Sequence, residues 1–385
     1  MRPEAIEPGV HNMHHEFVAP ARVNLLGEHT DYTGGFVLPM AIPFFTFASL
    51  SASKDAGYSF SSDRFPGLRE MPLADRSGAT GDWSDYPVGV LRELQALGIK
   101  PPPFALHLGG DIPIGSGLSS SASIEVASAM AMLAHAETEL PAGKIALLCQ
   151  RAENNYVGSP CGIMDQLVVT AAKAGHALLL DTRSLHWEHI PLPADVRIIV
   201  CNSMVKHSIA TGEYGIRRNE LEAGQAILMA NFLHIGSLRD ATLEDLKACQ
   251  DQMTPESFLR CRHIITENAR VLEAIEVLQR GDNVRFGELM LAGHVSERDD
   301  FACSCDEIDF LVETAASLDG CFGARLTGGG FGGCTVNLVA QEKTDAFAAE
   351  LKQSYLQSFG IAAEIYVCEA VDGAMLRNAK QETPA

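Results

Sequence analysis

One short segment of the chain gathers a cation, two carboxylates and an imidazole. Arg22, Glu28, His29 and Asp31 lie in the run Ala-Arg-Val-Asn-Leu-Leu-Gly-Glu-His-Thr-Asp-Tyr at residues 21–32. A loop without a task rarely holds charged and polar side chains at this density beside apolar residues. Donors and acceptors that converge in this way suit a small ligand rich in hydroxyl groups, such as a sugar. We therefore treat this segment as a candidate substrate site.

A glycine- and serine-rich segment lies at residues 111–123 and reads Asp-Ile-Pro-Ile-Gly-Ser-Gly-Leu-Ser-Ser-Ser-Ala-Ser. Glycine lets the backbone approach a ligand, and the free N–H groups at the start of the helix expected next attract phosphate. Serine hydroxyls add donors and a candidate ligand for magnesium. The alternative is a flexible loop followed by a serine-capped helix. A Walker A loop is excluded, because the chain has no Gly-x-x-x-x-Gly-Lys-Ser/Thr sequence.

Two further segments have residue types suited to chemistry. Asp165 lies in the run Cys-Gly-Ile-Met-Asp-Gln at residues 161–166, where a carboxylate among apolar residues needs a partner. A role as a helix N-cap is the alternative for Asp165. Residues 328–333 form Gly-x-Gly-x-x-Gly, but a β-branched run follows instead of a helix, which argues against a dinucleotide-binding fold.

Taken in order, these segments closely resemble the motifs of the galactokinases, a family of the GHMP kinase superfamily. Residues 21–32 are similar to the sugar-binding signature of that family, with Ala21 in place of a glycine. Residues 113–122 resemble its motif Pro-x-Gly-x-Gly-Leu-x-Ser-Ser-Ala. Residues 161–166 resemble the segment of the catalytic aspartate, and residues 323–334 resemble the third GHMP motif. The combination is far more specific than any single motif.

The resemblance implies ATP-dependent phosphorylation of the C1 hydroxyl of α-D-galactose. Asp165 would accept the hydroxyl proton or orient the attack, and Arg22 would keep Asp165 ionised and stabilise the transferring phosphoryl group. Mg²⁺ would be held by Ser121 and Glu153. The implied sugar-binding residues are Arg22, Glu28, His29, Asp31, Gly162, Asp165 and Tyr214. The implied ATP-binding residues are Trp83, Gly115, Gly117, Leu118, Ser119, Ser120, Ser121 and Lys206.

Two positions near the nucleotide depart from the family, and two alternative functions stay open. Lys206 stands where the family usually has arginine, and Asp82 stands where an arginine often precedes the tryptophan. The first alternative is a kinase for a related sugar, such as N-acetylgalactosamine, arabinose or galacturonate. The second is a catalytically silent galactose sensor, which the presence of Ser121-Ala122, Arg22 and Asp165 disfavours.

The elements that must position these residues form two blocks. In the first half we expect strands at 104–108, 177–181 and 196–201, a buried strand pair within 36–52, a polar surface excursion at 57–82, and helices over 124–136 and from 141 towards 156. In the second half we expect helices over 213–229, 258–279, 284–295, 307–318 and 343–358, and strands at 334–340 and 363–368. Segregated helices and antiparallel strands indicate an α+β protein.

The resemblance also implies the organisation of the domains. It predicts the two-domain GHMP kinase fold, with the active site in the cleft between the domains. A ribosomal protein S5 domain 2-like N-terminal domain would cover residues 1–185 and bind sugar and ATP. A ferredoxin-like C-terminal GHMP domain would cover residues 186–385.

The composition limits the partners of the protein. The 385 residues include 49 acidic and 29 basic ones, a net charge of −20, so neither nucleic acid nor an anionic membrane is an expected partner. No run reaches the roughly 20 apolar residues that a transmembrane helix needs, and the N-terminal segment lacks the apolar core of a signal peptide. Ten scattered cysteines without a CxxC pair suggest reduced thiols. We expect a cytoplasmic monomer that binds galactose and ATP.

Overall fold

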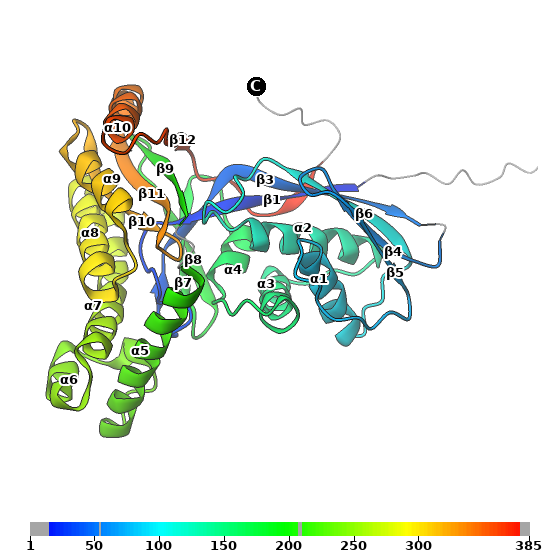
Figure 1. The fold of residues 1–385 in the computed structure, drawn as a ribbon, viewed down its shortest axis with the longest axis horizontal. Coiled ribbons are helices and arrows are strands. Elements are labelled where there is room, and N and C mark those ends of the chain that lie inside the picture. Colours follow the sequence, from blue (N-terminus) through cyan, green and yellow to red (C-terminus); the bar gives the residue numbers. More distant parts are fainter. Residues whose placement is uncertain (1–14, 54, 207–209, 378–385) are drawn as a thin grey trace, which may run out of the picture.

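The computed structural model describes residues 15–53, 55–206 and 210–377, which form three β-sheets and the helices that cover them. Figure 1 shows the six-stranded sheet in one half of the molecule and the four-stranded sheet in the other half. No helix in the described part of the chain is long and apolar enough to span a bilayer.

The first sheet has the strand order β13-β1-β3-β6-β4-β5, and all neighbours are antiparallel except β4 and β6. Its strands are β1 (His15–Asn24), β3 (Pro39–Ala52), β4 (Gly57–Ser62), β5 (Leu68–Pro72), β6 (Phe104–Gly110) and β13 (Met375–Arg377). Tyr58 and Phe60 of β4 are buried while Ser59 between them is not, which is the period of a strand with one covered face.

Two expectations for this region are wrong. Residues 57–82 contain the hairpin of β4 and β5 rather than a surface excursion, because the alternating apolar residues of β4 let it pair with β6. Residues 36–52 hold two strands that do not pair with each other. The short strand β2 (Phe36–Val37) pairs with β7 (His176–Asp181), whereas β3 pairs with β1 and β6.

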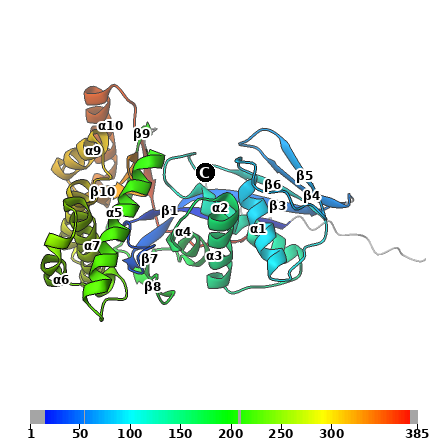
Figure 2. The ribbon, with the colours of Figure 1, turned by 60° about the horizontal axis from the view of Figure 1, so that its bottom comes forward.

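Four helices cover one face of the first sheet, as Figure 2 shows. They are α1 (Asp85–Ala96), α2 (Ser120–His135), α3 (Ala142–Arg151) and α4 (Met164–Ala171), and a π-helical segment, η1 (Ala152–Val157), continues α3. Helix α2 lies at the centre and contacts β1, β3 and the other three helices. Most of its residues are small or apolar and buried, as a central core helix requires.

The second sheet has the order β10-β11-β9-β12 and is antiparallel throughout, the arrangement of a ferredoxin-like βαββαβ unit. Its strands are β9 (Val196–Lys206), β10 (Cys321–Thr327), β11 (Gly332–Ala340) and β12 (Glu364–Cys368). Its helices are α5 (Ala210–Asn231), α6 (Leu243–Ala248), α7 (Pro255–Gln279), α8 (Asn283–Ser296), α9 (Asp306–Ser317) and α10 (Thr344–Phe359). Short turns of helix are η2 (Leu238–Asp240), η3 (Gln250–Gln252), η4 (Glu297–Phe301) and η5 (Gln341–Lys343).

A shared core joins the two halves. One apolar cluster combines Val23 of β1 with Val271 of α7 and Val336 of β11. A third sheet, β2-β7-β8, lies between the halves, with β8 at His186–Pro191. The last described strand, β13, returns to pair with β1. The predicted division between residues 185 and 186 stays a prediction, but side chains from both halves meet across this core.

Candidate active site

Arg22 and Asp165 form the centre of the site. Arg22 closely follows a register shift in β1 between Pro20 and Ala21, a feature that re-aims side chains. Its Nε and Nη2 atoms each donate to one carboxylate oxygen of Asp165 at 2.7 Å, and Nη1 donates to the Gly117 carbonyl at 2.6 Å. Such a bidentate pair fixes orientation as well as charge.

The local backbone explains two details of this centre. Asp165 lies in the first turn of α4, whose N-cap is Ile163, so the N-cap alternative for Asp165 is wrong. Ala21, where the family has glycine, is fully buried and its φ is not positive. Because any residue adopts such a backbone conformation, the strand accepts alanine there without strain.

The glycine- and serine-rich segment wraps around the pair. Ser119 has a left-handed φ of +60°, and its hydroxyl donates to Asp165 Oδ2 at 2.5 Å instead of capping the helix. The serine-cap alternative is therefore wrong, and the strained backbone at Ser119 is of the kind found at functional sites. Leu118 is buried in the core, so it can meet a ligand only through its backbone. Two loop glycines have positive φ, Gly115 at +68° and Gly117 at +81°.

Glu28 and His29 lie in the turn after β1, and both are buried. The Gly328 N–H donates to Glu28 Oε1 at 2.8 Å, which ties this turn to the glycine loop after β10. The His29 ring stacks on Phe301 with centroids 4.0 Å apart, and its Nδ1 lies 3.0 Å from the Tyr32 hydroxyl. Burial lowers the pKa of His29 well below its ordinary value, so the ring is neutral. Its Nε2 is buried and has no protein partner, a state that a ligand hydroxyl would relieve.

Asp31, Gly162 and Tyr214 complete the predicted sugar-binding set. A Cβ at position 162 would lie 1.8 Å from Asp31 Oδ2, so only glycine fits against this carboxylate. The Tyr214 ring of α5 lies 5.9 Å from the His29 ring. Burial and two neighbouring carboxylates raise the pKa of Asp31 to about 7. The structure therefore brings the predicted sugar-binding side chains together from β1, the turn after it, α4 and α5.

Glu153 of η1 is buried and hydrogen-bonded to Ser121, the other predicted magnesium ligand. Burial and the nearby Asp165 carboxylate raise the pKa of Glu153 to about 7. In the described residues, no group of three or more His, Cys, Asp or Glu side chains is arranged to hold a metal ion. Magnesium, however, usually takes one or two protein ligands and completes its shell with waters and phosphates. A cation would also relieve the crowding of carboxylates, so Ser121 and Glu153 fit the ion.

Glu125 of α2 is a fully buried carboxyl group that the sequence analysis missed. The Gln166 side-chain amide donates to Glu153 Oε2 at 2.7 Å and to Glu125 Oε2 at 3.2 Å. Burial and the charge of Glu153 raise the pKa of Glu125 well above its ordinary value. The only signal in the sequence is a lone glutamate between Ile124 and Val126 in an apolar helix. Gln166 thus links the two carboxyl groups and orients Glu153.

The glycine-rich segment at 323–334 forms the hairpin of β10 and β11, with no helix after the glycines. The dinucleotide-binding interpretation is therefore excluded. Arg325 of β10 is fully buried and donates to Glu267 Oε1 at 2.7 Å. The same oxygen accepts from the Gly27 N–H at 2.7 Å. Glu267, which the sequence analysis also missed, connects this hairpin to the turn that holds Glu28.

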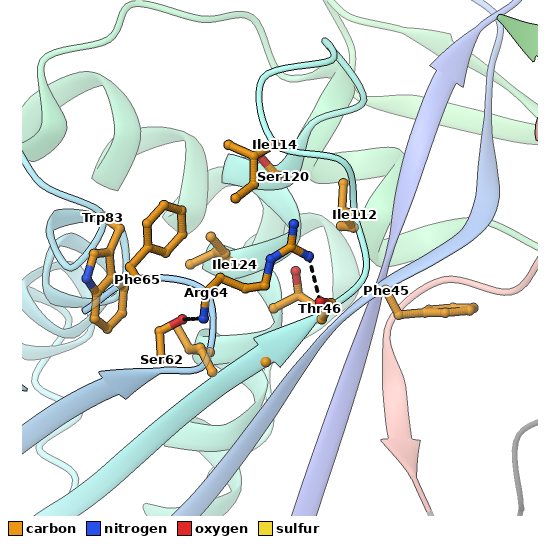
Figure 3. Close-up of a pocket in the computed structure, with 13 residues that line it drawn as sticks. Phe45, Thr46, Ser62, Arg64, Phe65, Trp83, Ile112, Ile114, Ser120 and Ile124 are labelled. Atoms are coloured by element: carbon orange, nitrogen blue, oxygen red, sulfur yellow. Dashed lines mark hydrogen bonds between the residues drawn. The ribbon is translucent and has the colours of Figure 1, made fainter. Parts of the chain in front are cut away.

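Trp83 lies apart from this cluster, in an open pocket that Ser120 also lines. Its ring is nearly parallel to that of Phe65, with an interplanar angle of 12° and centroids 6.0 Å apart. Figure 3 shows Arg64 between this aromatic pair and Ile112. The pocket borders the glycine- and serine-rich segment and has flat apolar walls, so it suits a planar ring system attached to phosphates.

The two positions near the nucleotide that depart from the family, Asp82 and Lys206, differ in what the structure describes. Asp82 accepts hydrogen bonds from the Ser84 N–H at 2.8 Å and the Thr80 hydroxyl at 3.0 Å, so its carboxylate stabilises the turn before α1. Lys206 ends β9, and its side chain lies outside the described part of the chain. The nucleotide role of Lys206 stays a prediction.

Comparison with known proteins relates this geometry to a superfamily. Residues 85–173 match the N-terminal domain of GHMP kinases, and residues 274–357 match the GHMP kinase C-terminal domain. The solved structure of Methanococcus jannaschii mevalonate kinase has a TM-score of 0.68 at 20% identity over 94% of this chain and 100% of that chain, which shows the shared fold. The fold and the site thus define a GHMP kinase, an enzyme that uses ATP as a phosphoryl donor.

Closer relatives narrow the assignment. Residues 10–52 match the galactokinase galactose-binding signature. The chain is 40% identical to the galactokinase of Roseiflexus sp. (strain RS-1), over 92% of this chain and 91% of that protein. It is 41% identical to the galactokinase of Actinobacillus succinogenes, over 92% and 93%. The crystal structure of Lactococcus lactis galactokinase complexed with galactose has a TM-score of 0.89 at 32% identity, over 94% and 95%. The chain belongs to the galactokinase family.

Proposed function

We propose that this protein transfers the γ-phosphoryl group of Mg-ATP to the C1 hydroxyl of α-D-galactose, which yields galactose 1-phosphate and ADP. The Arg22–Asp165 pair, with its two hydrogen bonds of 2.7 Å, carries the proposal. It lies where the sugar-signature residues meet the glycine- and serine-rich loop. A site that reads hydroxyl groups with buried polar side chains rejects sugars that lack them, because its own groups would be left unpaired.

In the proposed reaction, Asp165 accepts the proton of the C1 hydroxyl, and that oxygen forms a bond to the γ-phosphorus. The bond between the γ-phosphorus and the bridging oxygen of ADP breaks, and ADP leaves. Burial opposes the charge on Arg22, but the neighbouring carboxylates outweigh it and raise the pKa of the guanidinium. Arg22 therefore stays charged, holds Asp165 in place and stabilises the phosphoryl group in transit.

The remaining predicted residues divide between the two substrates. Glu28, His29, Asp31, Gly162 and Tyr214 bind sugar hydroxyls in this proposal. Residues 115–121 cradle the phosphates, with the nucleoside in the Trp83 pocket. Ser121 and Glu153 would hold magnesium, which when bound neutralises charge on the phosphate oxygens.

A coupled ADP-release assay tests this function. The protein is supplied with Mg-ATP and, in turn, galactose, 2-deoxygalactose, N-acetylgalactosamine, arabinose, galacturonate and glucose. Turnover on galactose but not on glucose is the expected result, because glucose differs only at the C4 hydroxyl. A strong preference for one of the other sugars would keep the mechanism and replace the substrate. Galactose binding in calorimetry without any turnover would support a sensor instead.

The proposed reaction takes place in the cytoplasm. All ten cysteines are free, which fits a reducing compartment. The expected monomer stays a prediction that light scattering on the purified protein can test.

A further inference from the structure

Arg64 is the only charged side chain among the described residues that line the Trp83 pocket. The walls around it are apolar or aromatic, and they include Phe65, Ile112 and Ile124. Ser120, at the start of α2, continues the pocket into the loop assigned to the phosphates. Arg64 itself is exposed to solvent, so its guanidinium is accessible to a ligand that enters the pocket.

The backbone around Arg64 holds it in this position. The neighbouring Asp63 N–H donates to the Leu108 carbonyl at 3.0 Å, which docks the end of β4 against β6. The Arg64 N–H donates to the Ser62 hydroxyl at 3.1 Å, and its Nη1 donates to the Gly110 carbonyl at 2.7 Å. A guanidinium has five N–H donors and two flat faces, so this single anchor leaves most of its binding capacity available.

Asp82 precedes Trp83 in the chain, but its carboxylate is engaged by Ser84 and Thr80 and does not oppose Arg64 inside the pocket. Arg64 comes from the turn between β4 and β5.

We propose that Arg64 binds the purine ring of the nucleotide, with its guanidinium plane stacked on the base and its Nη1 anchored to Gly110. Arginine is suited to this contact because its planar, weakly hydrated cation stacks on aromatic rings. The inference rests on the proposed use of ATP, and it adds a residue that neither the motifs nor the comparisons assign. It predicts that purine nucleotides gain more from Arg64 than pyrimidine nucleotides, since a purine offers a larger face.

The test compares Arg64→Ala with Arg64→Lys and with Arg76→Ala. Arg76 is exposed, lies after the same hairpin and lines no part of the pocket, so it is a matched control. We expect Arg64→Ala to raise the KM for ATP and the Kd for ADP by about 5- to 30-fold, the scale of a stacked cation. The KM for galactose and the melting temperature should stay unchanged. The ratio of kcat/KM for ATP to that for UTP should fall, and lysine should not restore it, because it keeps the charge but loses the plane.

Several outcomes would overturn the inference. An unchanged Kd for ADP in Arg64→Ala would do so, as would full rescue by lysine, which would leave only long-range charge attraction. An equal rise in the KM for galactose would indicate a general disturbance of the fold. If the unmodified protein shows no ATP-dependent turnover, the proposed function fails, and ADP calorimetry on the variants still decides the role of Arg64.

Discussion

Arg22 and Asp165 are 143 positions apart in the chain, yet two parallel hydrogen bonds of 2.7 Å join their side chains. The guanidinium has a third bond to the Gly117 carbonyl, and the Ser119 hydroxyl donates to the carboxylate. Each group of the pair is therefore held from two sides. The Asp165 carboxylate therefore keeps its position when substrates bind and products leave, as a proton acceptor in this reaction requires.

Asp165→Asn should lower kcat by about 10²- to 10⁴-fold, the usual contribution of a general base. The amide keeps the shape of the side chain, but it carries no charge and its NH₂ group cannot accept a hydrogen bond from Arg22, so the melting temperature should also fall. Asp165→Ala removes both oxygens of the carboxylate partner of the buried Arg22 and should cost about 3–5 kcal/mol of unfolding free energy. Steady-state kinetics and thermal unfolding separate the two effects. A near-normal kcat for Asp165→Asn would refute the proton-acceptor role.

Gly162→Ala should raise the KM for galactose by at least about 10-fold, because the new methyl group would lie 1.8 Å from Asp31 Oδ2 and would displace that side chain. The KM for ATP should change much less. Gly78→Ala is the matched control, since a Cβ there meets nothing within 4 Å and its φ is ordinary. Equal effects on both substrates would show that the substitution disturbs α4 as a whole rather than the sugar site.

The binding of sugar should depend on pH through Asp31. Its pKa is raised to about 7, first by burial, so the carboxylate that accepts hydroxyl hydrogen bonds forms only as the pH rises through about 7. We expect kcat/KM for galactose to rise with pH over that range. Asp31→Asn should remove this rise and should also weaken the binding of galactose. A profile of kcat/KM from pH 5.5 to 8.5, at saturating magnesium and ATP, provides the measurement. A rising limb that survives in Asp31→Asn must come from another group.

The raised pKa of Asp31 also predicts an effect on stability, and this effect has the opposite sign to the effect on sugar binding. A carboxyl group with a raised folded-state pKa contributes stability that is present at low pH and lost as the pH rises through about 7. Asp31→Asn should therefore raise the melting temperature at pH 8 by roughly 2–4 °C, about the shift for one kcal/mol, and less at pH 5. Differential scanning calorimetry at both pH values checks the sign. A loss of stability at pH 8 would mean that Asp31 makes a favourable contact as a carboxylate.

Gln166→Met should weaken the binding of magnesium, because the side-chain amide that links Glu125 to Glu153 is lost. Residues behind a metal ligand commonly change metal affinity by about 10- to 100-fold. The measurement is Mn²⁺ binding in the presence of ADP, followed by electron paramagnetic resonance, beside the magnesium dependence of turnover. Thr170→Val is the matched control, since Thr170 bonds only to the backbone of Gln166 in the same helix. Unchanged Mn²⁺ affinity in Gln166→Met would contradict the positioning role.

The chemistry of the site and much of the secondary structure could be predicted from residue types and their spacing. Arg22, Asp165, Glu153 and the serines of the loop could be recognised from the sequence, because they lie in or near short runs that resemble the motifs of a known family. Glycines at positive φ and amphipathic helices such as α7 leave such local signatures. The expected ferredoxin-like arrangement agrees with the strand order of the second sheet.

Which groups face one another, in contrast, follows from the tertiary fold. The contact of Gly162 with Asp31, the Glu125–Gln166–Glu153 link and the place of Arg64 beside Trp83 join segments that are distant in the chain. The pairing of β13 with β1 and the separation of β2 from β3 are of the same kind. Such contacts are set by packing and strand register across the whole fold, and a lone buried glutamate or an arginine in a turn carries no local pattern that reveals its partner.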